Sequence, residues 1–103
     1  MIQAKFYKSQ ELLTGFTFSG HSGYAESGED IVCAAVSSAV QLTVNMLDSF
    51  DCEPNVSAEE NVVDCRITAS HLTADAILTV FRKHLESILE EFPKTIKITI
   101  SEV

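Results

Sequence analysis

Residues 31–50 read Ile-Val-Cys-Ala-Ala-Val-Ser-Ser-Ala-Val-Gln-Leu-Thr-Val-Asn-Met-Leu-Asp-Ser-Phe, and the fold can be worked out from this stretch in both directions. Its apolar side chains cover most of the circumference of an α-helix, so we expect a helix that is largely buried. The apolar positions are Ile31, Val32, Ala35, Val36, Ala39, Val40, Val44, Met46, Leu47 and Phe50. A narrow polar stripe interrupts this apolar surface. Since an α-helix turns about 100° per residue, the five residues of the stripe fall within a sector of about 80° of its circumference. They are Asp30, Ser37, Gln41, Asn45 and Asp48. Cys33 lies at the edge of this stripe, one turn before Ser37.

Two strands are expected before the helix. Residues 2–7 alternate apolar Ile2, Ala4 and Phe6 with more polar side chains, which is typical of a half-buried strand. A polar turn follows at residues 8–11, and a second strand runs from Leu12 to about residue 19. The two strands are predicted to form a hairpin.

The chain after the helix contains three more strands and a second helix. Residues 56–58 and 63–68 look like a strand pair around the polar turn 59–61. Thr73 is the expected N-cap of the second helix, and Pro93 ends it. The apolar face of this helix consists of Ile77, Val80, Phe81, Leu85, Ile88, Leu89 and Phe92. A last strand covers residues 96–100. The order ββαββαβ predicts an α+β fold with a mainly antiparallel five-stranded sheet and two helices.

Residues 20–30 have a different character from the rest. They read Gly-His-Ser-Gly-Tyr-Ala-Glu-Ser-Gly-Glu-Asp, with three glycines and no periodicity. Ser27 followed by Asp30 resembles the start of the helix. Long loops inside compact domains are often functional, so we expect residues 20–30 to form part of a site.

Composition places the chain among ordinary globular proteins, with 46% hydrophobic and 21% charged residues. At this length, residues 1–103 are expected to form one domain. The three cysteines include no CxxC pair, which argues against a disulfide scaffold and fits a reducing cytoplasm. The net charge of −8 argues against a nucleic-acid binder and favours a basic partner. The N-terminus lacks the pattern of a signal peptide, and no apolar run approaches the length of a membrane span, so a soluble cytoplasmic protein is expected.

Cys33 and His21 are the candidate catalytic pair. A thiol peptidase needs a thiolate, an imidazole that accepts its proton and hydrogen-bond donors for the oxyanion. Cys33 lies near the expected helix start, where peptide dipoles favour an anion and free N–H groups are available as oxyanion donors. His21 could fold back from the loop onto it. Asp30 is placed to orient the imidazole, and Ser37 to line the site.

Each of these residues also has a plainer interpretation. An isolated cysteine on an apolar helix is usually a small packed hydrophobic residue, and a loop histidine is usually solvated. An aspartate in the position of Asp30 is more often a helix-start residue than a catalytic orienter, and a serine in the position of Ser37 is more often a packing residue. Cys52 and Cys65 are interpreted as structural. His71 and His84 fit a turn and a helix, and no zinc-ligand spacing occurs, so neither a metal nor a cofactor is expected.

A longer motif strengthens the catalytic interpretation. Residues 20–25, Gly-His-Ser-Gly-Tyr-Ala, and residues 28–37, Gly-Glu-Asp-Ile-Val-Cys-Ala-Ala-Val-Ser, resemble the ribosomal-processing cysteine proteases of the Prp family. The resemblance implies a bacterial cytosolic endopeptidase that removes the N-terminal extension of a large-subunit ribosomal protein. It implies His21 as the catalytic histidine and Cys33 as the nucleophile, with Asp30 and Ser37 matching further family positions.

The same resemblance implies a homodimer and a mobile loop over the cleft at residues 22–29. The expected substrate-loop residues are Gly20, Ser22, Gly23, Tyr24 and Gly28. Ser22 stands where many relatives carry alanine. The expected partner is a basic ribosomal protein precursor, without direct nucleic-acid or membrane binding. Two alternatives are a non-catalytic acidic adaptor that binds a basic ribosomal protein or assembly factor, and a structural dimer module without a pocket.

Overall fold

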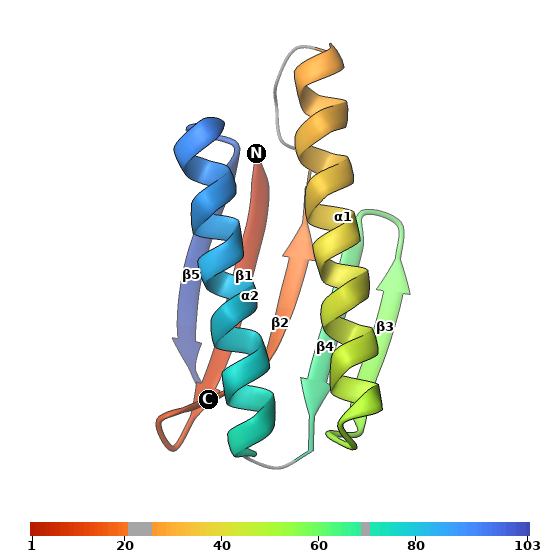
Figure 1. The fold of residues 1–103 in the computed structure, drawn as a ribbon, viewed down its shortest axis with the longest axis vertical. Helices are drawn as coiled ribbons and strands as arrows, with labels where there is room; N and C mark the ends of the chain where they lie inside the picture. Colours follow the sequence, from red (N-terminus) through yellow and green to blue (C-terminus); the bar gives the residue numbers. More distant parts are fainter. Residues whose placement is uncertain (21–25, 69–70) are drawn as a thin grey trace.

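The computed structural model describes residues 1–20, 26–68 and 71–103, and for residues 26–30 it describes the backbone alone. Across these residues the predicted order ββαββαβ is confirmed (Figure 1). The elements are β1 (Ile2–Ser9), β2 (Leu12–Ser19), α1 (Glu26–Ser49), β3 (Pro54–Glu59), β4 (Val62–Ile67), α2 (Leu72–Glu91) and β5 (Ile96–Glu102).

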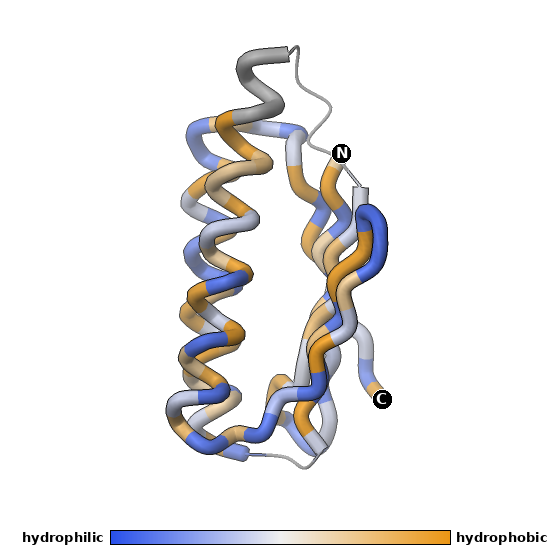
Figure 2. Tube along the Cα trace, turned by 90° about the vertical axis from the view of Figure 1, so that its right-hand side faces the viewer, coloured by the Kyte–Doolittle hydropathy of each residue, from blue (hydrophilic) through white to orange (hydrophobic). Residues whose placement is uncertain are grey.

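The described strands form one sheet in the order β3-β4-β2-β1-β5. The pairs β1–β2, β2–β4 and β3–β4 are antiparallel, whereas β5 runs parallel to β1. Both helices lie on one face of the sheet, and the turned view in Figure 2 shows helices and sheet as two layers. The predicted α+β class and mainly antiparallel sheet are therefore correct.

The core lies between the two layers and is centred on four phenylalanine rings. Strand alternation places Phe6 of β1 and Phe16 and Phe18 of β2 on the face that meets the helices. The ring of Phe81 from α2 packs among them, with its centroid 5.3–5.7 Å from each of the other three. Phe81 meets Phe6 and Phe16 edge to face and stacks on Phe18. Such ring contacts add to the stabilisation by burial, so α2 is anchored on β1 and β2.

The helix α1 begins at Glu26, earlier than the expected start near Ile31. Gly28, predicted to belong to a substrate loop, therefore lies within the helix. The sequence reason is that Glu26 and Glu29 favour helix and acidic residues suit a helix N-terminus, so one glycine does not prevent the earlier start. Cys33 is then the eighth residue of α1. The free N–H groups of the first turn, which were the expected oxyanion donors, lie more than a turn before it.

The prediction that α1 is largely buried is wrong for its outward side. Ile31, Leu42 and Phe50 are 55%, 59% and 59% exposed, and Val80 of α2 is also exposed. In a two-layer fold each helix packs one side on the sheet, and nothing in the described parts covers the other side. By length and composition alone, residues 31–49 could cross a membrane, and 22% of that window is buried. The buried side of α1 packs against the sheet.

The N-cap of α2 is His71, not the expected Thr73. The helix starts at Leu72, and the Nδ1 atom of His71 accepts hydrogen bonds from the backbone N–H groups of Thr73 and Ala74 at 3.2 and 3.4 Å. Histidine is an uncommon cap, which is why the usual preference for a hydroxyl side chain pointed to Thr73. In this geometry Nδ1 carries no proton.

Tyr7, expected on the polar side of β1, is nearly buried on the open face of the sheet. Its ring lies under the guanidinium of Arg66, 3.7 Å from ring centroid to carbon, and its hydroxyl is 2.7 Å from the hydroxyl of Thr17. Thr17 donates its own proton to Asp64 at 2.5 Å, so Tyr7 is the donor to Thr17. Gly15 lies between Tyr7 and Arg66 in the sheet register and leaves room for the stacking. These contacts join β1, β2 and β4.

Candidate active site

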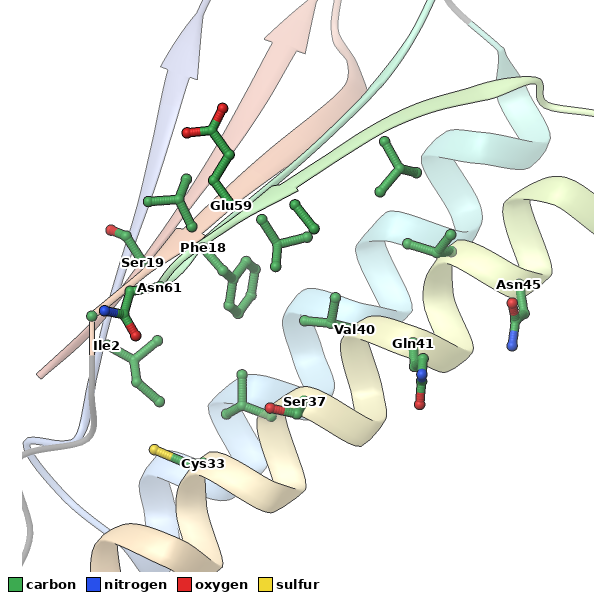
Figure 3. Close-up of a pocket in the computed structure, with 17 residues that line it drawn as sticks. Ile2, Phe18, Ser19, Cys33, Ser37, Val40, Gln41, Asn45, Glu59 and Asn61 are labelled. Atoms are coloured by element: carbon green, nitrogen blue, oxygen red, sulfur yellow. The ribbon is translucent and has the colours of Figure 1, made fainter.

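Cys33 lines a groove between α1 and the β3–β4 hairpin. The groove has a volume of about 640 Å³, within the range of about 300–1,000 Å³ typical of ligand sites. Figure 3 shows Cys33 at one end, with its sulfur on the side of α1 that faces Ile2 and the sheet. The side chain is half-buried, so the thiol is held by packing while remaining accessible from the groove.

The groove has an apolar floor and polar edges. Val36, Val40 and Val44 line it from α1, and Phe18 and Val63 line it from the sheet. The helix edge carries the polar stripe Ser37, Gln41 and Asn45, and the opposite edge carries Glu59 and Asn61 (Figure 3). The predicted stripe on α1 is therefore one wall of the site.

Gly20 brings the chain to the same groove. Its φ of +85° lies in the left-handed region, and a Cβ at this position would lie 2.8 Å from the carbonyl oxygen of Met1. Its N–H donates to the carbonyl oxygen of Asn61 at 3.3 Å, in the β3–β4 turn. Gly20 and Cys33 therefore line one groove, and His21, the next residue in the sequence, lies outside the described part of the chain.

Several predicted site residues lie outside the described part of the chain. These are His21, Ser22, Gly23 and Tyr24, together with the side chain of Asp30. Of the remaining candidates, the structure brings Ser37 and Gly20 to the groove with Cys33. The expected contact between His21 and Cys33 thus stays a prediction.

The other two thiols are unsuited to nucleophilic chemistry. Cys65 is fully buried on β4. Burial is the larger cause and the nearby Asp64 carboxylate the smaller cause that together raise the pKa of its thiol to about 11. Burial and the Asp51 carboxylate also raise the pKa of Cys52. Both side chains therefore stay protonated at neutral pH, and Cys33 is the cysteine that opens onto the groove. The structural interpretation of Cys52 and Cys65 agrees with their burial.

Sequence reasoning missed the sheet side of the site. Asn61, Val63 and Phe18 reach the groove only because β4 pairs with β2 next to α1, and this tertiary contact leaves no local signal. Gln41 and Asn45 did have a signal, since the polar stripe that contains them continues from Cys33.

Among the described residues, no cluster of three histidine, cysteine or acidic side chains could hold a metal ion.

Comparison with known proteins identifies the family. The family model for cysteine protease Prp matches residues 1–97. The chain belongs to the cysteine protease Prp family. A comparison with curated proteins finds no match.

Solved structures share the fold of this Prp-family protease. The crystal structure of SMU.848 from Streptococcus mutans is 26% identical, with a TM-score of 0.84 over 100% of this chain and 96% of that one. Two crystal structures of the ribosomal processing protease Prp from S. aureus are each 24% identical over 98% of this chain and 100% of theirs. One contains a covalently linked product peptide and the other a substrate peptide, with TM-scores of 0.87 and 0.86.

Proposed function

We propose that this Prp-family cysteine protease is a bacterial cytoplasmic endopeptidase that removes the N-terminal extension of a large-subunit ribosomal protein precursor. The observation that carries the proposal is that Cys33 and Gly20, the residue before His21, line one groove. The S. aureus proteases of the same fold are ribosomal processing enzymes, and one was crystallised with a substrate peptide. These relatives support the substrate class.

In the proposed mechanism, His21 accepts the proton of the Cys33 thiol, and the thiolate attacks the scissile carbonyl carbon. The tetrahedral intermediate collapses to an acyl-enzyme as His21 protonates the leaving amine. Water, deprotonated by His21, then attacks the thioester and releases the extension with a free carboxylate. The Cys33 thiol is regenerated, so the cycle consumes only water.

Two further groups support the pair in this proposal. Asp30 orients the imidazole of His21 and stabilises its protonated form, which favours the thiolate–imidazolium pair. Ser37 lies one turn after Cys33 on the same groove wall and contributes a hydroxyl donor to the site. The net charge of −8, together with Glu59 at the end of β3 and Glu60 in the turn that follows, favours encounter with a basic substrate.

We also propose a homodimer formed through the outward faces of the helices. A shallow depression of about 400 Å³ lies between α1 and α2 on this side, lined by Leu42, Met46 and Val80 among others. Contiguous exposed apolar surface of this kind is typical of an interface with a partner copy. Covering it in a dimer also removes the apolar side of α1 from water.

The test is incubation of the pure protein with the extended precursor, with the products weighed by mass spectrometry. We expect one cleavage in the N-terminal region by the wild type, and a loss of at least about 10³-fold in rate for Cys33→Ala and for His21→Ala. Cys52→Ala is the matched control and should cleave at close to the wild-type rate if the variant is folded. Cleavage by Cys33→Ala at the wild-type rate would overturn the assignment.

Thiol labelling, together with the mass of the incubated precursor, separates a protease from an acidic adaptor. A protease predicts that iodoacetamide modifies Cys33 far faster than Cys52 or Cys65, and that a substrate-like peptide protects it. An adaptor predicts tight binding of the precursor without any change in its mass. Slow and unselective labelling together with an intact precursor would favour the adaptor.

A further inference from the structure

The polar stripe continues along the groove well beyond the catalytic cysteine. Ser37, Gln41 and Asn45 follow Cys33 at four-residue steps on the helix side of the groove. In Figure 3 the amides of Gln41 and Asn45 turn outward, away from the strands, so they lie at the outer rim of the groove. With a rise of about 1.5 Å per residue, Asn45 lies about 18 Å along α1 from Cys33. The stripe is therefore much longer than a catalytic pair requires.

Between its two acidic ends, Asp30 and Asp48, the polar stripe is neutral, although the protein as a whole is strongly charged. The chain has 15 acidic and 7 basic residues, yet residues 31–47 include none of them. Covering a charged side chain with a ligand requires costly desolvation, whereas an amide exchanges its bound water for ligand hydrogen bonds. The side-chain amides of Gln41 and Asn45 make no hydrogen bond within the described part of the chain, so both can bind a ligand.

The shape of the groove suits an extended peptide. Val40 and Val44 from α1 face Val56 and Val63 from the hairpin across the floor, and Val56 is half-exposed. An extended chain rises about 3.3 Å per residue and turns alternate side chains to opposite sides. The distance of about 18 Å from Cys33 to Asn45 thus accommodates about five residues. Every second side chain would lie on the apolar floor.

We propose that Gln41 and Asn45 bind the main chain of the substrate segment on one side of the scissile bond. This inference rests on the proposed protease function. An amide side chain offers a donor and an acceptor, as each peptide unit does, so the pairing does not depend on the substrate side chain above it. The floor beneath selects apolar residues at alternate positions.

The experiment measures how cleavage depends on substrate length. The cleaved bond is first located by mass spectrometry of the digested precursor, and peptides spanning it are then shortened one residue at a time from either end. On one side of the cleaved bond, the wild type should depend on the length of the peptide. Each residue removed from the last five or so before the bond on that side should raise KM. Gln41→Ala and Asn45→Ala should each raise KM about five- to tenfold for the full-length peptide, with kcat nearly unchanged. For a peptide that keeps only two residues on that side of the bond, both variants should have the same KM as the wild type.

Two amides away from the groove provide matched controls. Gln3→Ala and Asn55→Ala remove exposed amides from strands on the open face of the sheet and should leave KM unchanged. Binding of a fluorescent peptide to Cys33→Ala, with and without Gln41→Ala, tests the contact without turnover. If Gln41→Ala and Asn45→Ala leave KM and peptide binding at wild-type values while the wild type cleaves, this inference is wrong and the proposed function stands. If the wild type cleaves nothing, the proposed function fails first.

Discussion

The three cysteine side chains are chemically identical, and their different surroundings decide how easily each thiol ionises and whether a substrate can reach it. Cys52 and Cys65 are buried beside carboxylates, and both influences disfavour the thiolate. Cys33 lies on the edge of α1 that borders the groove, beside the polar stripe, and packs only partly against the core. Burial thus separates two structural thiols from one thiol that a substrate can reach.

The raised pKa of Cys65 predicts a loss of stability in alkali. Its pKa is about 11 in the folded protein against 9.0 for the free side chain, so folding favours the protonated form. The contribution of the protonated Cys65 thiol to the free energy of unfolding is therefore complete below pH 9 and is lost as the pH rises through about 11. Urea unfolding of the wild type and Cys65→Ala at pH 7.5, 9 and 10.5 measures this. The difference in the free energy of unfolding between the wild type and Cys65→Ala should shrink as the pH rises. A difference that does not change with pH would contradict the prediction.

Gly20→Ala should damage the site more than the fold. The substitution places a Cβ against the carbonyl oxygen of Met1 at a positive φ, which costs about 1–2 kcal/mol in the free energy of unfolding. Since His21 follows directly, kcat/KM should fall at least about tenfold. Ser57→Ala, an exposed change on β3, serves as the control for both measurements. Wild-type kinetics in a stably folded Gly20→Ala protein would mean that this backbone conformation does not position His21.

Among the elements, α1 combines packing and site formation. Its inner side meets the sheet, its polar stripe borders the groove and its outward side is apolar and exposed. The helix α2 serves packing and is tied to the sheet by a specific contact. The carboxylate of Asp75, in its first turn, accepts the backbone N–H of Leu13 at 2.8 Å.

This contact makes Asp75 a stability residue. Asp75→Ala leaves the partly buried N–H of Leu13 without its acceptor and should lower the free energy of unfolding by about 1–3 kcal/mol. Asp75→Asn retains an oxygen acceptor and should lose less than half as much. Urea midpoints of the two variants test this, with exposed Lys83→Ala on the same helix as the control. Equal midpoints for Asp75→Ala and Lys83→Ala would show that the contact contributes nothing.

Element types were predictable because apolar periodicity is a local property of the chain. The alternation at Ile2, Ala4 and Phe6 and the helical period after Ile31 both identified the correct element. Features that depend on tertiary neighbours were not predictable. Tyr7 is buried because Gly15 lets Arg66 reach its ring, and the exposed side of α1 follows from the two-layer arrangement. For the site, Cys33 and the adjacent stripe were found in sequence, whereas the hairpin wall required the fold.

At the scale of the whole molecule, the two-layer arrangement separates two surfaces. The groove opens between α1 and the hairpin, and the apolar helix side faces away from the sheet. A dimer formed through the helix side would bury that surface and leave both grooves open. Substrate access and association therefore need not compete.

The proposed dimer predicts a concentration-dependent mass in sedimentation velocity. Leu42→Glu places a charge on the exposed apolar side of α1 and should convert the dimer to monomer, with a rise in the dissociation constant of at least about a hundredfold. Val103→Glu changes an equally exposed apolar residue at the C-terminus and should leave the dimer intact. A monomeric wild type, or a Leu42→Glu dimer of unchanged stability, would contradict this interface.

The covalent intermediate offers the most direct test of the Cys33–His21 assignment. Wild-type enzyme mixed with the precursor and quenched in acid during turnover can be digested and mapped by tandem mass spectrometry. We expect the N-terminal extension to be attached as a thioester to Cys33, and His21→Ala to accumulate at least about a hundredfold less of it in the same time. An extension attached to Cys52 or Cys65, or cleavage with no adduct on any cysteine under conditions that stabilise thioesters, would contradict the assignment.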